Sequence, residues 1–252
     1  MLILLSNDDG YFANGLIALR KFLSKYAHVV TVAPDRDRSG ASHSLTVTRP
    51  LRVKRIEKDY YAVDGTPTDA VMIAVYRLLK RKPDLVVSGI NCGANMGEDV
   101  TYSGTVAAAM EGALFGIPSI AVSLTGMGRS NHLDQREYLK AAKFTYKVIK
   151  QAEKKKLPEG VLLNINVPMG PDVDIKNYAI TNLGKRVYDD VITEKIDPRG
   201  GYYYWIAGTV RVTGKGPDTD FGAIENNLIS VTPLALDNTA KDFITELKSW
   251  RF

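Results

Sequence analysis

The sequence predicts a Rossmann-like three-layer α/β fold, in which a mostly parallel sheet lies between two layers of helices. Short apolar runs alternate with helical segments along the first 168 residues, as they do in doubly wound sheets. The runs are uninterrupted, which suits strands that are covered on both faces. With 252 residues, of which 45% are hydrophobic and 24% charged, the chain is long enough to bury a core of this kind.

The first elements follow directly from apolar patterning. The run at residues 2–5 predicts a buried strand, which the turn formers after it end. Apolar residues at helical spacing between 16 and 23 predict a helix, with Asn14 placed as its cap. The run HVVTVA at 28–33 predicts a second strand. Residues 45–63 then alternate apolar and charged side chains, as half-exposed antiparallel strands do.

A capping box marks the start of the next helix. Thr66 stands at the N-cap position, Pro67 at the first helical position and Asp69 at the reciprocal position of the box. Apolar spacing carries this helix to about residue 80. The short run DLVVS at 84–88 then predicts another buried strand.

The remaining core elements repeat the alternation. A helix of small residues at 105–115 leads into a strand at 119–123. A long amphipathic helix at 135–156 precedes the last clear core strand at 161–167. After Pro168 the regular alternation stops, so the chain is expected to change character there.

We therefore divide the chain into two parts. Residues 1–168 form the Rossmann-like core, and residues 169–252 form a C-terminal part with a β-hairpin arm and a terminal helix. The aromatic run YYYW and the extended stretch after it predict the arm, and a final strand and helix close the chain. These segments lie at residues 202–205, 208–212, 228–232 and 239–250.

Charge and composition indicate which class of binding partner to expect. The net charge of +5 and the pI near 9.1 favour anionic partners. The densest basic run, at 147–156, lies at the end of a helix, where cations are favoured by the helix dipole. No nucleic-acid motif is present, so we expect a small phosphate compound rather than a specific nucleic acid.

The location is expected to be cytoplasmic, without a membrane partner. No apolar stretch is long enough to span a bilayer, and the N-terminus shows no signal peptide. Cys92 is the single cysteine, which excludes an internal disulfide framework and fits a reducing compartment.

Polar loops follow three of the predicted core strands, at residues 7–14, 34–44 and 89–103. In a doubly wound sheet such loops meet at one edge, where the strand order reverses. Their carboxylate, amide and hydroxyl oxygens form a hard ligand set, suited to magnesium, manganese or calcium. The residues expected in this neighbourhood are Asp8, Asp9, Ser39, Ser42, His43, Asn91, Asn95, Ser103 and Thr105.

Two features of these loops point to phosphate-ester hydrolysis. Asp8 and Asp9 are adjacent, and two carboxylates repel each other unless a cation or a proton lies between them. Ser103, Gly104 and Thr105 open a helix, whose free N–H groups attract an anion. A metal beside an anion cradle can neutralise phosphate oxygens and acidify a water molecule.

Each feature has an alternative. An isolated Asp-Asp-Gly is more often a solvated turn, and His43 is either a general acid, a phosphate contact or a polar loop residue. Glycines recur at 89, 93 and 97, a spacing that differs from the dinucleotide-binding fingerprint, so a nicotinamide cofactor is disfavoured.

Several segments in order resemble the SurE family. They are LLSNDDGYFANGL, VAPDRDRSGASHSLT, DGTPTDAV, VVSGINCGANMGEDVTYSGTVAAAMEGALFGIPSIAVS and LLNINVP, with YYYW and SVTPL further on. The resemblance implies a metal-dependent 5′-nucleotidase, a phosphoric monoester hydrolase. Such an enzyme removes phosphate from nucleoside 5′-monophosphates. Activity on 3′-monophosphates and on short polyphosphate is left open.

The resemblance also implies the site and the assembly. One divalent cation per subunit, Mg²⁺ or Mn²⁺, is expected on Asp8, Asp9, Ser39 and Asn91. The phosphate is expected at Ser103, Gly104 and Thr105, with Asn95, Ser42 and His43 on the substrate side. Small residues in the loop SGASHS depart mildly from the family pattern. A homodimer or homotetramer with exchanged C-terminal arms is implied.

Three readings of the chemistry stay open at this point. Water polarised by the metal attacks in line, with Asp8 or Asp9 as base. In the second reading, Asp8 is a covalent nucleophile, as in aspartyl-phosphate enzymes. In the third, the protein is not an enzyme and only senses a phosphate ligand, which would bind without turnover.

Overall fold

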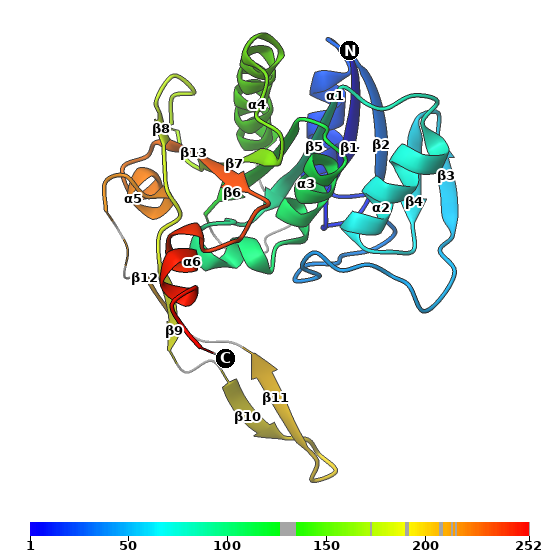
Figure 1. Ribbon diagram of the computed structural model, residues 1–252. Coiled ribbons are helices and arrows are strands. Elements are labelled where there is room, and N and C mark those ends of the chain that lie inside the picture. The colour runs from blue at the N-terminus through cyan, green and yellow to red at the C-terminus, as the bar shows by residue number, and fades with distance from the viewer. Residues whose placement is uncertain are drawn as a thin grey trace.

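A central sheet organises the computed structural model, which describes residues 1–126, 135–171, 173–189, 192–206, 209–212, 214 and 216–251. Within these residues, nine strands form the sheet in the order β3-β4-β2-β1-β5-β6-β7-β13-β8 (Figure 1). All neighbouring pairs are parallel except β3–β4 and β7–β13. The mostly parallel sheet predicted from the sequence is confirmed.

The strands of this sheet are β1 (Leu2–Ser6), β2 (His28–Pro34), β3 (Val53–Glu57), β4 (Tyr60–Val63), β5 (Leu85–Cys92), β6 (Ser119–Thr125), β7 (Val161–Pro168), β8 (Tyr178–Ile180) and β13 (Ile229–Ala235). The helices are α1 (Asn14–Leu23), α2 (Pro67–Ile73), α3 (Gly104–Leu114), α4 (Gln135–Lys155), α5 (Asp220–Glu225) and α6 (Lys241–Leu247). A π-helical turn, Ala74–Leu78, continues α2, and a 3₁₀ helix, η2, spans Gly97–Thr101.

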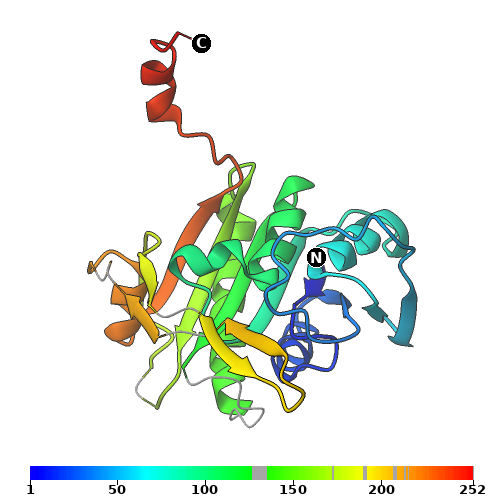
Figure 2. The same cartoon turned by 90° about the horizontal axis from the view of Figure 1, so that it is seen from below.

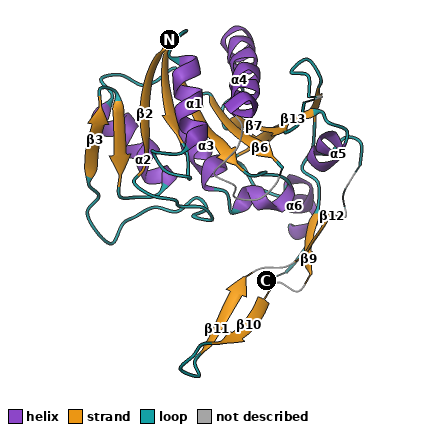
Figure 3. Ribbon diagram, turned by 180° about the vertical axis from the view of Figure 1, so that it is seen from behind, coloured by secondary structure: helices purple, strands orange, loops and turns teal. Residues whose placement is uncertain are grey.

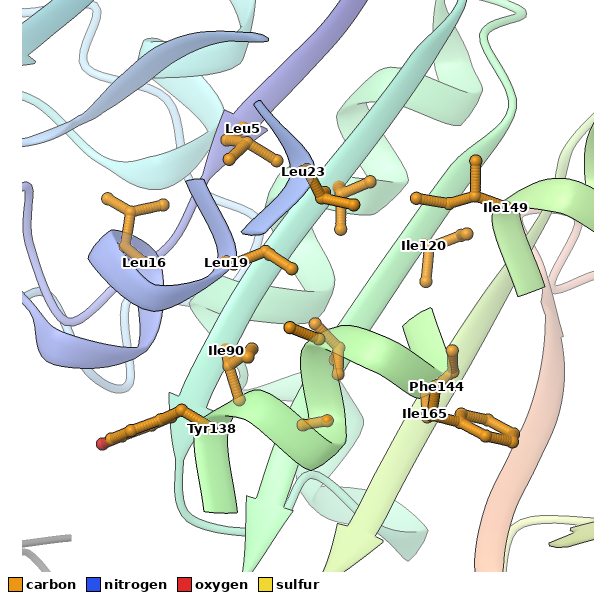
Figure 4. Packing of buried hydrophobic residues seen from close by; sticks show 14 of the residues in the cluster. Leu5, Leu16, Leu19, Leu23, Ile90, Ile120, Tyr138, Phe144, Ile149 and Ile165 are labelled. Atoms are coloured by element: carbon orange, nitrogen blue, oxygen red, sulfur yellow. The ribbon is translucent and has the colours of Figure 1, made fainter. Parts of the chain in front are cut away.

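Helices cover both faces of the sheet, which gives the predicted three layers (Figures 1 and 3). On one face, α1 and α4 pack onto the sheet through the largest apolar cluster, to which Leu19, Ile120 and Phe144 belong (Figure 4). On the other face, α2 and α3 pack over two smaller clusters. Burial of these apolar side chains is the main stabilising term for a fold of this kind.

The start of α1 differs from the prediction. The N-cap is Ala13, which makes no side-chain cap bond, and Asn14 is the first helical residue. The backbone N–H of Ala13 donates to Gly10 O (3.0 Å), so a turn in the preceding loop fixes where the helix begins. The apolar residue Ile17 is 44% exposed, although its spacing predicted a place on the buried face.

Only the second half of the alternating stretch at 45–63 is confirmed as strand. β3 and β4 pair antiparallel, whereas residues 45–52 are irregular. This segment is fastened instead to the start of α2, where Asp69 accepts a bond from the Thr46 N–H (3.0 Å). The same carboxylate closes the capping box with Thr66, as predicted.

The C-terminal part extends the sheet and then leaves it. β13 pairs with β7, and β8 pairs with β13, so the sheet continues beyond residue 168. The division of the chain at residue 168 stays a prediction. No helix in the described part of the chain is both long and apolar enough to cross a lipid bilayer.

Two-stranded ribbons form the arm, which projects away from the sheet (Figures 1 and 3), and the terminal helix α6 stands apart from the sheet in the view from below (Figure 2). We define the arm as β9 (Arg186–Asp189), β10 (Ile192–Ile196), β11 (Tyr202–Ile206) and β12 (Thr209–Val212). The aromatic strand β11 pairs with β10, and β12 pairs with β9. The predicted segments at 202–205 and 208–212 cover most of β11 and all of β12, with residue 208 outside the described residues, whereas neither β9 nor β10 was predicted. The side chains of β11 and the whole of α6 are exposed.

Candidate metal and phosphate site

The reversal of strand order lies between β1 and β5. From β1 the chain builds the sheet outward through β2 and β4, and from β5 it builds in the opposite direction through β6 and β7. The loops that follow β1, β2 and β5 therefore meet at the carboxyl edge, as predicted. Backbone bonds join them: Arg38 N–H donates to Asp8 O (2.8 Å), and Ser42 N–H donates to Tyr102 O (3.1 Å).

The adjacent aspartates contact two different elements. Asp8 is 4% exposed, and its Oδ1 accepts a hydrogen bond from the Thr105 hydroxyl at the start of α3. Asp9 accepts at Oδ2 from the backbone N–H of Cys92 at the end of β5 (3.3 Å). The turn after β1 thus directs one carboxylate toward α3 and the other toward β5.

Burial dominates the electrostatics of Asp8. Loss of water around the carboxylate raises the pKa of Asp8, and the hydrogen bond from Thr105 offsets part of this rise. The negative charge of nearby Asp37 raises this pKa further. A cation nearby would favour the charged form of a carboxylate in such surroundings.

The N-terminus of α3 packs directly against Asp8. A Cβ on Gly104 would lie 2.7 Å from Asp8 Cβ and 3.0 Å from Pro67 Cγ, so a side chain here requires neighbouring atoms to move. Ser103 is the N-cap, and its Oγ accepts from Val106 N–H (3.1 Å). The helix therefore begins with its backbone close to a buried carboxylate.

Thr105 differs from the role that the sequence suggested. Its side chain is fully buried, and its hydroxyl donates to Asp8. The hydroxyl thus orients the carboxylate. The Val106 N–H is already bonded to Ser103 Oγ, so within the first turn of α3 the Gly104 N–H is the donor suited to an anion.

The loop after β2 carries Ser39 together with an acidic residue, Asp37, that was not among the predicted site residues. Both the N–H and the hydroxyl of Ser39 donate to Asp37 Oδ1, at 2.8 Å and 2.6 Å. Ser39 follows Arg38, whose N–H bonds Asp8, so this turn lies beside the aspartate pair.

Ser42 and His43 fasten the same loop to the elements that follow β5. The Ser42 hydroxyl donates to Thr101 O in η2 (2.6 Å). His43 Nε2 lies 2.8 Å from Glu111 Oε2, and Glu111 is buried on α3. Glu111 is the one charged residue of α3, so its place in an otherwise small and apolar helix is the feature of the sequence that marks it.

The two predicted asparagines have different surroundings. Asn91 donates through Nδ2 to Gly93 O (2.9 Å), so its carbonyl oxygen is the atom suited to a cation. Asn95 is buried in a network with β6 and β7. Its Nδ2 donates to Ser123 Oγ (2.8 Å), its N–H to Asn166 Oδ1 (2.9 Å), and its carbonyl oxygen accepts from Asn164 and Asn166.

The donor set fits a hard divalent cation. Carboxylates from Asp8 and Asp9, an amide oxygen from Asn91 and a hydroxyl from Ser39 are ligands that Mg²⁺ and Mn²⁺ accept. Oδ1 of Asn7, next in the chain, is buried and without a hydrogen-bond partner in the described structure. One buried acceptor next to the aspartate pair is thus left without a donor. The described residues contain no cluster of three or more His, Cys, Asp or Glu side chains that could hold a metal ion.

The chain is similar to known proteins over nearly its whole length. The family model described as survival protein SurE matches residues 3–190. A protein named 5′-nucleotidase SurE from Methylobacillus flagellatus is 50% identical over 250 residues, covering 99% of both chains. One of the same name from Coxiella burnetii is 46% identical over 248 residues, covering 98% of this chain and 94% of the relative. The crystal structure of the SurE protein from Aquifex aeolicus superposes with a TM-score of 0.84 at 42% identity and covers 98% of each chain. The chain belongs to the SurE family.

Proposed function

We propose that the protein is a metal-dependent 5′-nucleotidase, which removes phosphate from nucleoside 5′-monophosphates. The observation that carries this proposal is the meeting of Asp8, Asp9 and the start of α3 at the point where strand order reverses. Its relatives in Methylobacillus and Coxiella are named 5′-nucleotidases. Activity on 3′-monophosphates and short polyphosphate is an extension of the same proposal.

The proposed metal ligands are Asp8, Asp9, Ser39 and Asn91, for one Mg²⁺ or Mn²⁺ per subunit. When bound, the cation would neutralise phosphate oxygens and lower the pKa of a water molecule. Asp8 and Asp9 also serve as the proposed catalytic pair, because a carboxylate beside the phosphate can accept a proton from water.

The proposed phosphate site is the start of α3, at Ser103, Gly104 and Thr105. Backbone N–H groups there would bind the phosphate oxygens, assisted by the helix dipole. Thr105 holds Asp8 in its orientation through the hydroxyl bond. Asn95, Ser42 and His43 are proposed for the substrate side of the site, where their bonds also keep the loops in place.

The testing experiment is a phosphate-release panel over several nucleoside 5′- and 3′-monophosphates and polyphosphate. It is run with Mg²⁺, with Mn²⁺ and with a chelator. Release that needs a divalent cation is expected. Binding of nucleotide without turnover under every metal condition would show a sensor instead. Rapid quenching and a search for phosphorylated Asp8 separate direct attack by water from a covalent intermediate.

A homodimer or homotetramer is the proposed assembly. Tyr202, Tyr204 and Trp205 of the arm are exposed in the single chain, and large aromatic residues are favoured at interfaces. A native mass of two or four chains, reduced by Tyr204→Ser together with Trp205→Ser, is expected by light scattering. A parent mass of one chain at micromolar concentration would refute the assembly. The cytoplasmic location stays a prediction that rests on the single cysteine.

A further inference from the structure

The 3₁₀ helix η2 controls where α3 begins. The backbone carbonyl of Asp99 in η2 accepts hydrogen bonds from Tyr102 N–H (3.0 Å) and Ser103 N–H (3.1 Å). Ser103 is the N-cap of α3, and Thr105 of the same turn bonds Asp8. A displacement of Asp99 is therefore passed to the first turn of α3 through short, directional contacts.

The arm contacts η2 through its first residue. The Arg186 guanidinium pairs with the Asp99 carboxylate, and the Arg186 N–H donates to Glu98 Oε2 (2.7 Å). The side chains of Arg186 and Asp99 are 23% and 15% exposed, so solvent screens this ion pair less than a surface pair.

A buried carboxylate from α5 fixes the other end of η2. Asp220 has no exposed surface, and it accepts from Gly97 N–H and from Gly184 N–H, both at 2.8 Å. A Cβ on Gly97 would lie 2.8 Å from Gly184 O, so the two backbones are in close contact. The segment just before the arm is thus packed onto the start of η2.

The loop after β2 holds η2 from another direction, through the bond from the Ser42 hydroxyl to Thr101 O. We propose that Arg186, Asp99 and Asp220 are positioning residues, which set the phosphate-binding turn of α3 by fixing η2 to the base of the arm. The proposal rests on the proposed function. It predicts that a change at the arm's base alters phosphate binding, although the arm carries none of the proposed ligands.

The test uses the full-length protein with Arg186→Met, which keeps the long apolar stem and removes the charge. The KM for a nucleoside 5′-monophosphate is expected to rise about tenfold while kcat changes by less than about threefold, because contacts to a phosphate that is already charged in the ground state are lost. Metal affinity by calorimetry and native mass stay at the parent values. Arg186→Lys, which keeps a charge, should recover most of the KM.

Arg81→Met is the matched control. Arg81 also pairs with an aspartate, Asp84 (2.8 Å), but at the opposite edge of the sheet. Its KM should equal that of the parent. Hydrogen exchange at residues 97–106 should be faster in Arg186→Met and unchanged in Arg81→Met. Where Arg186→Met fails to fold, Asp99→Asn replaces it with the same expectations.

A parent-like KM, or parent-like exchange at residues 97–106, in a folded Arg186→Met protein overturns the proposal, as does an equal rise of KM in Arg81→Met. Failure of the proposed function has a different outcome, because the parent itself then releases no phosphate. In that case hydrogen exchange and the affinity for inorganic phosphate, measured by calorimetry, still decide whether Arg186 positions the turn.

Discussion

The two edges of the sheet differ in what they bring together. At the carboxyl edge, polar groups from the loops after β1, β2 and β5 point into one small region around Asp8. At the amino edge, a pocket of about 830 Å³ lies beside the starts of β5 and β7 and the ends of α3 and α4. This pocket is thus on the side away from the proposed chemistry.

Two carboxylates at the amino edge are neutralised locally. Asp84 is paired with Arg81, and Glu153 is paired with Lys150. Much of the remaining pocket wall is apolar, including Leu85, Ile117 and Leu157. The presence of a pocket of this volume favours the amino edge as the site, whereas convergent polar groups favour the carboxyl edge. We rely on the second criterion, because catalysis needs positioned charges and donors rather than volume.

Removing a carboxylate at the carboxyl edge should have the largest effect. Asp9→Asn keeps the shape and removes one negative ligand, so kcat/KM should fall on the order of 10³-fold, more than the 10- to 100-fold typical of an outer-shell partner. Metal titration by calorimetry should show weaker binding, and excess metal should restore part of the activity. Metal binding equal to that of the parent would show that Asp9 is not a ligand.

Glycine substitutions compare the two edges directly. Gly104→Ala places a methyl group 2.7 Å from Asp8 Cβ, so it should displace Asp8 and lower kcat/KM about 10²-fold, as a shift of about 1 Å does. Gly160→Ala at the amino edge meets open space but has a φ of +70°. It should lower the free energy of unfolding by about 1 kcal/mol and leave kcat/KM unchanged. Full activity of Gly104→Ala would contradict the placement of the catalytic site at the carboxyl edge.

Loss of the Thr105 hydroxyl should lower kcat/KM less than Asp9→Asn or Gly104→Ala does. Thr105→Val removes the bond to Asp8 at similar volume, so a 10- to 100-fold fall in kcat/KM is expected, typical of an outer-shell partner. Thr105→Ser keeps the hydroxyl and should retain most of the activity. Equal losses in the two variants, measured by steady-state kinetics, would show that packing rather than the hydrogen bond is responsible.

Acid stability should show the smallest effect, and only at the amino edge. The bond from Arg81, and then that from the Leu2 N–H, hold the pKa of Asp84 well below its usual range. This stabilisation is present above the unfolded-state pKa and is lost as the pH falls through the lower folded-state pKa, that is, below about pH 4. Thermal unfolding of Asp84→Asn should therefore depend less on pH than that of the parent in this range, with unchanged activity at neutral pH. A steeper dependence would contradict the assigned pair.

Local patterning predicted the parts of the fold that depend on nearby residues. Uninterrupted apolar runs located β1, β5, β6 and β7, and the Thr66 capping box located the start of α2. A doubly wound sheet brings the loops after its parallel strands to one edge, so the meeting of three loops was predictable from the fold class as well.

Contacts between distant residues could not be predicted in this way. β8 and β10 are short or exposed, so no buried face marks them in the sequence. The bond from Thr105 to Asp8 and the burial of Asp220 under Gly97 depend on side-chain directions after folding. The cap of α1 was missed because a turn at Gly10, rather than the intrinsic preference of Asn14, fixes its start.

The place of β13 has a consequence during synthesis. In the described sheet, β7 lies between β6 and β13, and β13 follows the arm in the chain. A nascent chain on the ribosome therefore keeps the β7 edge open until Ile229–Ala235 has emerged. Every proposed ligand lies before residue 106, so premature termination after the arm would spare all of them. Such a product would expose an unpaired strand edge, which is a template for aggregation.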